Sequence, residues 1–60
     1  MRWNRYWAVL VNVHTGMRTP LRFARFRHDW QADDWCHRIN KAQLRVQSYP
    51  SIEFRYELIP

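Results

Sequence analysis

The chain has 60 residues, with 10 Lys and Arg against 5 Asp and Glu, which gives a net charge of +5. A chain of this length has room for one domain, residues 1–60, and no second one. Aromatic residues make up 17% of the chain, which excludes a disordered tail, because such segments are poor in large aromatics. The longest uninterrupted apolar run, residues 6–11, is too short for a membrane helix or a signal-peptide core. We therefore expect a single small basic domain.

The sequence contains one cysteine, Cys36. A single cysteine cannot build an internal disulfide framework, and this usage is typical of a reducing compartment. We therefore expect a cytoplasmic protein. With no disulfide, four Trp, three Tyr and three Phe side chains or a partner subunit must supply much of the core.

Residues 5–13 predict the first strand, because they are rich in aromatic and β-branched types and contain no Gly or Pro. Alternation divides this segment into two faces. One face holds Trp7, Val9, Val11 and Val13, and the other holds Tyr6, Ala8, Leu10 and Asn12. Both faces are mostly apolar, so we expect this strand at the centre of the sheet.

Residues 14–20 contain the only glycine and a proline and predict a hairpin loop. A second strand follows at residues 21–27, but its pattern is blurred, because Phe26 is out of phase with Leu21 and Phe23. A bulge near Ala24–Arg25 would restore the phase, and bulges favour edge strands. We therefore expect an edge strand that is protected from aggregation by its charges.

Residues 30 to about 46 predict a helix with one apolar stripe. The stripe holds Ala32, Trp35, Cys36, Ile39, Ala42 and Val46. Asp29 is the expected N-cap, since aspartate both caps a helix and favours its positive end. Trp30 lies off the stripe. It is either an anchor of the cap region against the sheet or an exposed contact residue.

Residues 52–59 predict a third strand with Ile52, Phe54, Tyr56 and Leu58 facing inward. The succession of these elements along the chain predicts an α+β fold, ββαβ. We expect a three-stranded antiparallel sheet with the strand order 2-1-3 and one helix packed on one face. The other face is predicted to leave Tyr6, Leu10 and Phe26 uncovered. A homodimer through that face is one hypothesis.

Charge is distributed unevenly along the chain. Residues 1–28 contain no acid and six arginines: Arg2, Arg5, Arg18, Arg22, Arg25 and Arg27. The arginine fork suits phosphates and carboxylates and stacks on bases, so this half is a candidate surface for DNA, RNA or an acidic partner. The alternative is a solvated edge kept soluble by charge. Glu53 and Glu57 count against a nucleic acid spread across the sheet, and we expect them to pair with Arg5 or Arg22.

No set of residues predicts catalysis, a metal site or a cofactor. Cys36 and His37 are neighbours that diverge by about 100° on a helix and cannot form a dyad. Helix capping explains the acids near residues 29–34, and one glycine excludes a glycine-rich phosphate loop. We therefore expect neither an enzyme nor a small-molecule substrate.

The favoured function is non-enzymatic nucleic-acid binding through the arginine-rich N-terminal hairpin. The alternative is a small modulator or inhibitor that docks on an acidic surface of a larger host protein, with Trp3 or Trp30 as anchor. In general character the chain resembles phage and prophage accessory proteins, being small, basic, aromatic-rich and without catalytic residues. That resemblance implies the modulator role.

Overall fold

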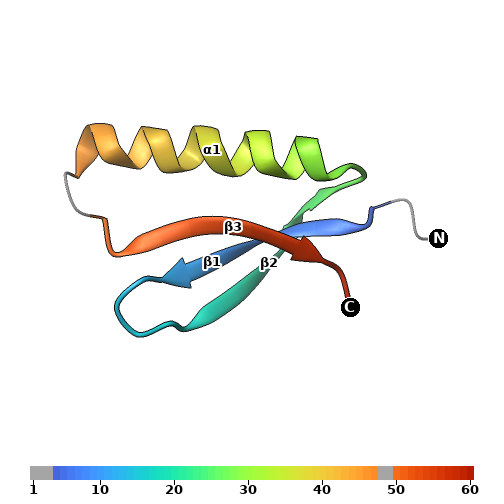
Figure 1. The fold of residues 1–60 in the computed structure, drawn as a ribbon, viewed down its shortest axis with the longest axis horizontal. Coiled ribbons are helices and arrows are strands. Elements are labelled where there is room, and N and C mark those ends of the chain that lie inside the picture. Colours follow the sequence, from blue (N-terminus) through green and yellow to red (C-terminus); the bar gives the residue numbers. More distant parts are fainter. Residues whose placement is uncertain (1–3, 48–49) are drawn as a thin grey trace.

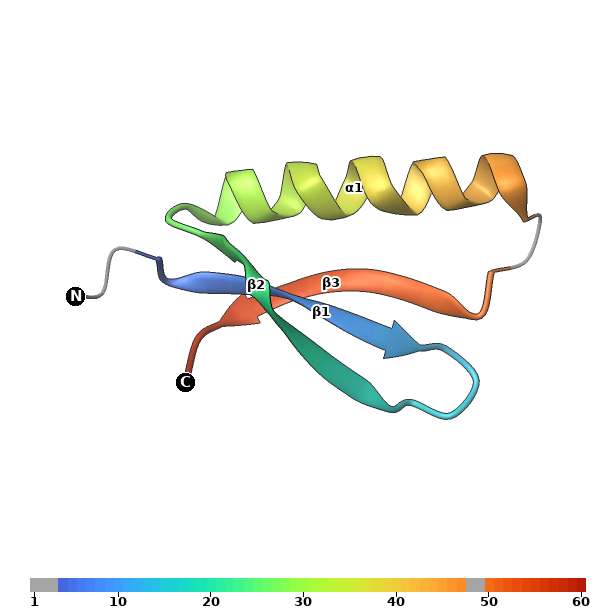
Figure 2. The ribbon, with the colours of Figure 1, turned by 180° about the vertical axis from the view of Figure 1, so that it is seen from behind.

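A computed structural model describes residues 4–47 and 50–60 of the chain. Its elements are β1 (Tyr6–Asn12), β2 (Arg18–Phe26), α1 (Asp29–Val46) and β3 (Ile52–Leu58). The strands form one antiparallel sheet in the order β2-β1-β3. Helix α1 runs along one face of this sheet (Figures 1 and 2). The predicted ββαβ fold is therefore confirmed, with the apolar β1 at the centre.

Strand β2 contains the predicted bulge. Ala8 pairs with Leu21 and Trp7 pairs with Arg25, so residues 22–24 have no partner on β1. The strand also starts earlier than its pattern predicts and includes Pro20, opposite Val9. A proline is tolerated there because its position on an edge strand lets the missing N–H fall on the solvent side.

The hairpin between β1 and β2 closes on the side chain of Asn12. Its Oδ1 accepts hydrogen bonds from the N–H groups of His14 at 2.9 Å and Thr15 at 3.1 Å. Gly16 has a φ of 77° and donates its N–H to the Asn12 carbonyl at 2.8 Å. A positive φ is a conformation that glycine adopts at no steric cost, which explains the only glycine at this turn.

The core between α1 and the sheet is built around small residues. Ala8, Ala24 and Cys36 are buried there, and Trp35 packs on Phe26 and Phe54 with ring centroids 5.8 and 5.7 Å apart. Burial, together with the negative charge of Asp33, raises the pKa of the Cys36 thiol to about 11. The thiol therefore stays protonated and behaves as a small apolar group.

The prediction of which sheet face lacks a helix is wrong. Tyr6, Leu10 and Phe26 lie on the side of α1: Phe26 packs on Trp35, Tyr6 lies 6.0 Å from Tyr56, and Leu10 pairs with Phe54. The face without a helix carries Trp7, Val9 and Val11 instead. Both faces of β1 are apolar, so alternation alone could not decide which of them the helix covers.

Helix α1 keeps only the first half of its predicted stripe against the sheet. Ala32 and Cys36 are buried and Trp35 is half-buried, whereas Ala42 is exposed and Val46 is 85% exposed. The N-cap is His28 and not Asp29, and the His28 N–H donates to Gln31 Oε1 at 3.2 Å. Within the described ranges, no helix is long and apolar enough to cross a membrane.

Two amide side chains replace apolar contacts in the second half of α1. Asn40 accepts from the N–H of Phe54 at 2.8 Å and donates to its carbonyl at 2.9 Å. Gln43 donates to the carbonyl of Ile52 at 3.1 Å. These backbone groups lie on the side of β3 that faces away from β1, which is an edge of the sheet. The helix therefore provides hydrogen-bond partners for the first residues of this edge strand.

Candidate nucleic-acid interface

The face without a helix is covered by charged side chains. Trp7 and Val11 are only 7% exposed and Val9 is fully buried, with Ile59 packed against them. Among the side chains of the two outer strands on this face, four charged ones are joined in pairs, and we call these four the charged layer. The charged layer consists of Arg18, Glu53, Arg55 and Glu57.

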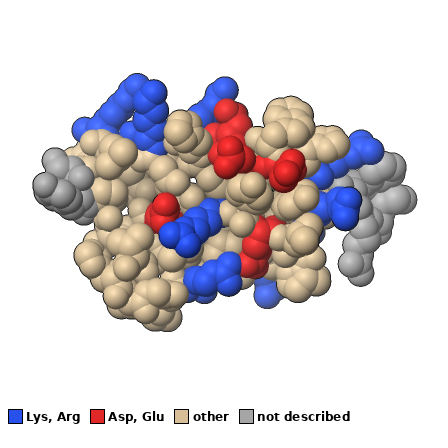
Figure 3. Space-filling model, viewed as in Figure 1, with Lys and Arg blue, Asp and Glu red and all other residues tan. Residues whose placement is uncertain are grey.

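The charged layer is internally paired. Glu57 accepts from the indole Nε1 of Trp7 at 2.9 Å and forms an ion pair with Arg18. Arg55 donates to Glu53 at 2.8 Å. These partners differ from the expected Arg5 and Arg22. Figure 3 shows acidic and basic side chains next to one another across the middle of this view, where β3 lies in Figure 1.

The ionised carboxylate of Glu57 is the form that accepts these bonds. The hydrogen bond from Trp7, and then those from Arg18, lower the pKa of the Glu57 carboxyl below its ordinary value of 4.5. A carboxylate so stabilised remains ionised at neutral pH and keeps Arg18 occupied. The two arginines of the charged layer therefore face two carboxylates at close range, which leaves little net charge to attract a polyanion.

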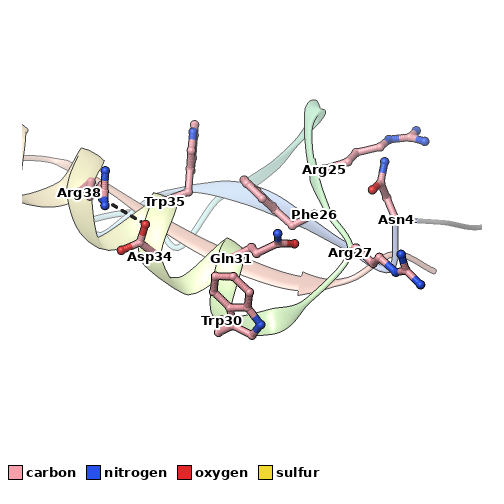
Figure 4. A pocket seen from close by; sticks show the side chains of 9 residues that line it. All are labelled: Asn4, Arg25, Phe26, Arg27, Trp30, Gln31, Asp34, Trp35 and Arg38. Atoms are coloured by element: carbon pink, nitrogen blue, oxygen red, sulfur yellow. Dashed lines mark ion pairs between the residues drawn. The ribbon is translucent and has the colours of Figure 1, made fainter.

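A different arrangement occurs where β2 passes into α1. A hollow of about 560 Å³ opens between the last residues of β2 and the first turns of the helix. Asn4, Arg25 and Arg27 come from the strand side, and Trp30, Asp34 and Arg38 come from the helix (Figure 4). The rings of Phe26 and Trp35 also line it. We call this the Trp30 hollow.

Trp30 provides an exposed aromatic surface at this hollow. Its side chain is 65% exposed, although large aromatics usually bury most of their area. The His28 ring lies parallel to it, with centroids 6.0 Å apart and an interplanar angle of 9°. The His28 ring therefore lies beside the indole, most of which is exposed to solvent.

Basic groups outnumber acidic ones around the Trp30 hollow. Arg25, Arg27 and Arg38 line it together with a single carboxylate, Asp34. Asp34 pairs with Arg38 at 3.0 Å across one helical turn, and both side chains are more than half exposed. Such an exposed pair is weak, so it leaves Arg38 able to reorient toward another anion.

Arg25 is held in place by two contacts. Its Nε donates to the carbonyl of Arg22 at 2.8 Å, and its guanidinium lies 5.9 Å from the centroid of the Trp7 ring. The bulge of β2 supplies the Arg22 carbonyl, so the irregular strand positions this arginine. A guanidinium fixed by packing loses less freedom when it binds a phosphate.

The structure separates the predicted site residues into three groups. Arg25, Arg27 and Trp30 come together at the Trp30 hollow, and Phe26 forms part of its wall. Arg5 lines a neighbouring hollow with Leu58 and Ile59, and Asn4 lies between the two. Arg18 belongs to the charged layer. Arg2 and Trp3 lie outside the described residues.

Asn4, Gln31 and Arg38 line the hollow but were not expected at a site. Arg38 is exposed and lies off the apolar stripe of α1. Only the crossing of α1 over the end of β2 brings Arg38 toward Arg25 and Arg27. A basic residue two turns after the exposed Trp30, on the same side of the helix, was the signal available.

No group of three or more His, Cys, Asp and Glu side chains suited to a metal ion occurs among residues 4–47 and 50–60. Comparison of the chain with protein-family models, curated proteins and solved structures finds no match. The site must therefore be interpreted from its own chemistry.

Proposed function

We propose that the protein binds single-stranded nucleic acid at the Trp30 hollow. The observation that carries the proposal is the exposed indole of Trp30 in a hollow that three arginines also line. Base stacking on an aromatic ring combined with phosphate contacts from arginine is the common way of binding single strands. From the sequence, the arginines suited either function and Trp30 was an anchor for the docking alternative, but the two features share one hollow.

The geometry favours a single strand over a duplex. A base can stack on the open face of Trp30 only when it is not enclosed in a base-paired helix. Arg25 and Arg27 extend from the end of β2 away from Trp30 (Figure 4), so we place there the phosphates of the strand that leads away from a stacked base. The paired charges of the charged layer explain why we do not place the strand across the open sheet face.

The proposal is tested by fluorescence anisotropy with labelled oligothymidylate and oligouridylate over a range of salt concentrations. Each phosphate neutralised on a single strand contributes about −0.7 to the slope of log affinity against log salt. Contacts from three arginines therefore predict a slope of about −2. Arg27→Gln and Arg38→Gln should each flatten the slope by about 0.7, whereas Arg45→Gln, which removes a charge from the last turn of α1, should leave it unchanged.

Trp30→Ala has a different expected signature. Loss of one stacked base should weaken binding by about 5- to 150-fold, the equivalent of about 1–3 kcal/mol, while the salt slope stays the same. Trp30→Phe should restore most of the affinity because it keeps a ring. If the purified protein does not bind either oligonucleotide at low salt, the proposal is wrong, and docking on an acidic protein surface becomes the better explanation of the same residues.

A further inference from the structure

The two outer edges of the sheet are protected to different degrees. On β2, Pro20, the bulge at residues 22–24 and several arginines interrupt the edge, which are the usual devices against strand pairing. On β3, the odd residues bond to β1, so the N–H and C=O groups of Ile52, Phe54, Tyr56 and Leu58 point outward. Two side chains of helix α1 bond part of this edge. Asn40 bonds both the N–H and the carbonyl of Phe54, and Gln43 bonds the carbonyl of Ile52.

The remaining part of the β3 edge is open. In the described part of the chain, no strand or side chain bonds the outward groups of Tyr56 or Leu58. Both side chains are also partly exposed apolar groups, on the side of the sheet that carries α1. An open strand edge with apolar side chains is a template for another strand.

We propose that two copies of this chain pair antiparallel through the second half of β3, with Tyr56 of each copy on the two-fold axis. This register follows from charge complementarity. When Tyr56 faces Tyr56 of the second copy, Arg55 of each copy lies directly opposite Glu57 of the other. Within their own copy Arg55 is paired with Glu53 and Glu57 with Arg18, so the contact across the axis adds a second partner to each. Opposite charges at directly facing positions stabilise an antiparallel pair.

Neighbouring registers are disfavoured by the same residues. A pair centred on Arg55 or on Glu57 brings two like charges together. A pair centred on Leu58 places Tyr56 opposite Pro60, which has no N–H to donate. A pair centred on Phe54 competes with the two hydrogen bonds from Asn40. The pair centred on Tyr56 sets free backbone groups against each other at its centre and places opposite charges beside them. It brings Leu58 opposite Phe54, whose backbone groups stay bonded to Asn40.

The dimer has a defined architecture. A two-fold axis through the Tyr56 pair is perpendicular to the sheet, so the two sheets join into one antiparallel sheet with both helices on the same face. The interface uses β3, whereas the residues of the Trp30 hollow come from β2, α1 and the segment before β1. The inference therefore does not rest on the proposed function.

Disulfide trapping tests the register directly. Facing residues in a hydrogen-bonded pair have Cα atoms about 5.5 Å apart, which a disulfide can bridge. Tyr56→Cys in a Cys36→Ala background should therefore form a covalent dimer under mild oxidation. Leu58→Cys in the same background is the matched control, because the two introduced thiols would lie on residues about 14 Å apart. Equal cross-linking of both variants, or of neither, overturns the proposed register.

Sedimentation equilibrium tests the association itself without any introduced cysteine. The protein should show a concentration-dependent dimer, and Arg55→Glu should raise its dissociation constant about tenfold by placing like charges opposite each other. Lys41→Glu makes the same change in net charge on the exposed surface of α1 and should have little effect. The weakest association that the proposal allows has a dissociation constant of about 1 mM. A protein that remains monomeric at all concentrations up to about that value would refute the proposal.

Discussion

Trp7 and Trp30 lie in two regions that are built from the same residue types but differ in their charge balance. Around Trp7, two arginines of the charged layer are paired with two carboxylates, and the indole itself is bonded to Glu57. Arg25 lies over the Trp7 ring and also lines the Trp30 hollow, so it borders both regions. Around Trp30, three arginines line the hollow with one carboxylate, and the indole is 65% exposed. The charge in the first region is balanced, whereas the second region has more arginines than carboxylates.

This contrast shows why the number of arginines is a poor measure of a binding surface. The first 28 residues hold six arginines and no acid, but β3 brings Glu53 and Glu57 onto the same face as Arg18. Arg38 comes from the part of the chain that is nearly neutral overall and still joins the basic hollow. The fold redistributes the charge, and only the redistributed pattern indicates where an anion can bind.

The largest expected effect comes from placing a charge beneath the charged layer. Val9→Asp encloses a carboxylate without a partner, which costs about 3–5 kcal/mol and is comparable with the total stability of so small a core. We expect the variant to be unfolded by circular dichroism. Val13→Asp, at a position that is 49% exposed, should melt close to the wild type. A folded Val9→Asp variant would show that water reaches the face of β1 that carries Trp7, Val9 and Val11.

The two tryptophans should differ when each is replaced by phenylalanine. Trp7→Phe removes the donor to Glu57, and a hydrogen bond to a charged group is worth about 1.5–3 kcal/mol. Trp30→Phe removes no hydrogen bond between side chains and should change stability by less than about 0.5 kcal/mol. Urea denaturation of both variants measures the difference. Equal losses would contradict the assignment of Trp7 to the fold and of Trp30 to binding.

Stability should depend on pH through Glu57. Its pKa is lower in the folded chain than in the unfolded chain, so its contribution is present above the unfolded value and is lost as the pH falls through the folded value. Glu57→Gln should therefore reduce the fall in melting temperature between neutral pH and about pH 3. An unchanged pH profile in this variant would show that the ion pair with Arg18 contributes nothing to stability.

The smallest effect on stability is expected for the acid in the Trp30 hollow. Asp34→Asn breaks only an exposed pair with Arg38 and should change stability by less than about 0.5 kcal/mol. It should nevertheless raise oligonucleotide affinity about two- to fivefold, because one repulsive charge is removed and Arg38 is released. Asp33→Asn makes the same charge change at a different hollow, beside His37 and Tyr56, and should not alter the affinity.

Much of the fold could be predicted because local pattern and topology agree. Alternation in residues 52–59, the bulge near Ala24–Arg25 and the apolar residues of β1 led to the observed strand order. Alternation groups residues on a face but does not say which face receives the helix. Since Trp7 and Leu10 are both large and apolar, the sequence left that choice open, and the prediction was wrong.

The candidate site was only partly predictable for a related reason. Arg25, Arg27 and Trp30 were singled out one by one, from charge and from a break in periodicity. Their meeting in one hollow depends on how α1 crosses the end of β2, which no local pattern records. Asn40 was missed altogether, because a polar residue near the inner side of a helix gives no indication that it will satisfy a strand edge.

The central claim is that a single strand binds at the Trp30 hollow and not on the charged layer. Each indole N–H gives its own signal in a ¹⁵N–¹H correlation spectrum, so one titration with oligothymidylate at low salt compares both regions in the same sample. We expect the Trp30 signal to move progressively with added oligonucleotide, and the Trp7 signal to move much less, because its N–H is bonded to Glu57 and only Arg25 connects its ring with the hollow. Movement of the Trp7 signal with an unchanged Trp30 signal, or no movement of either, would contradict this claim.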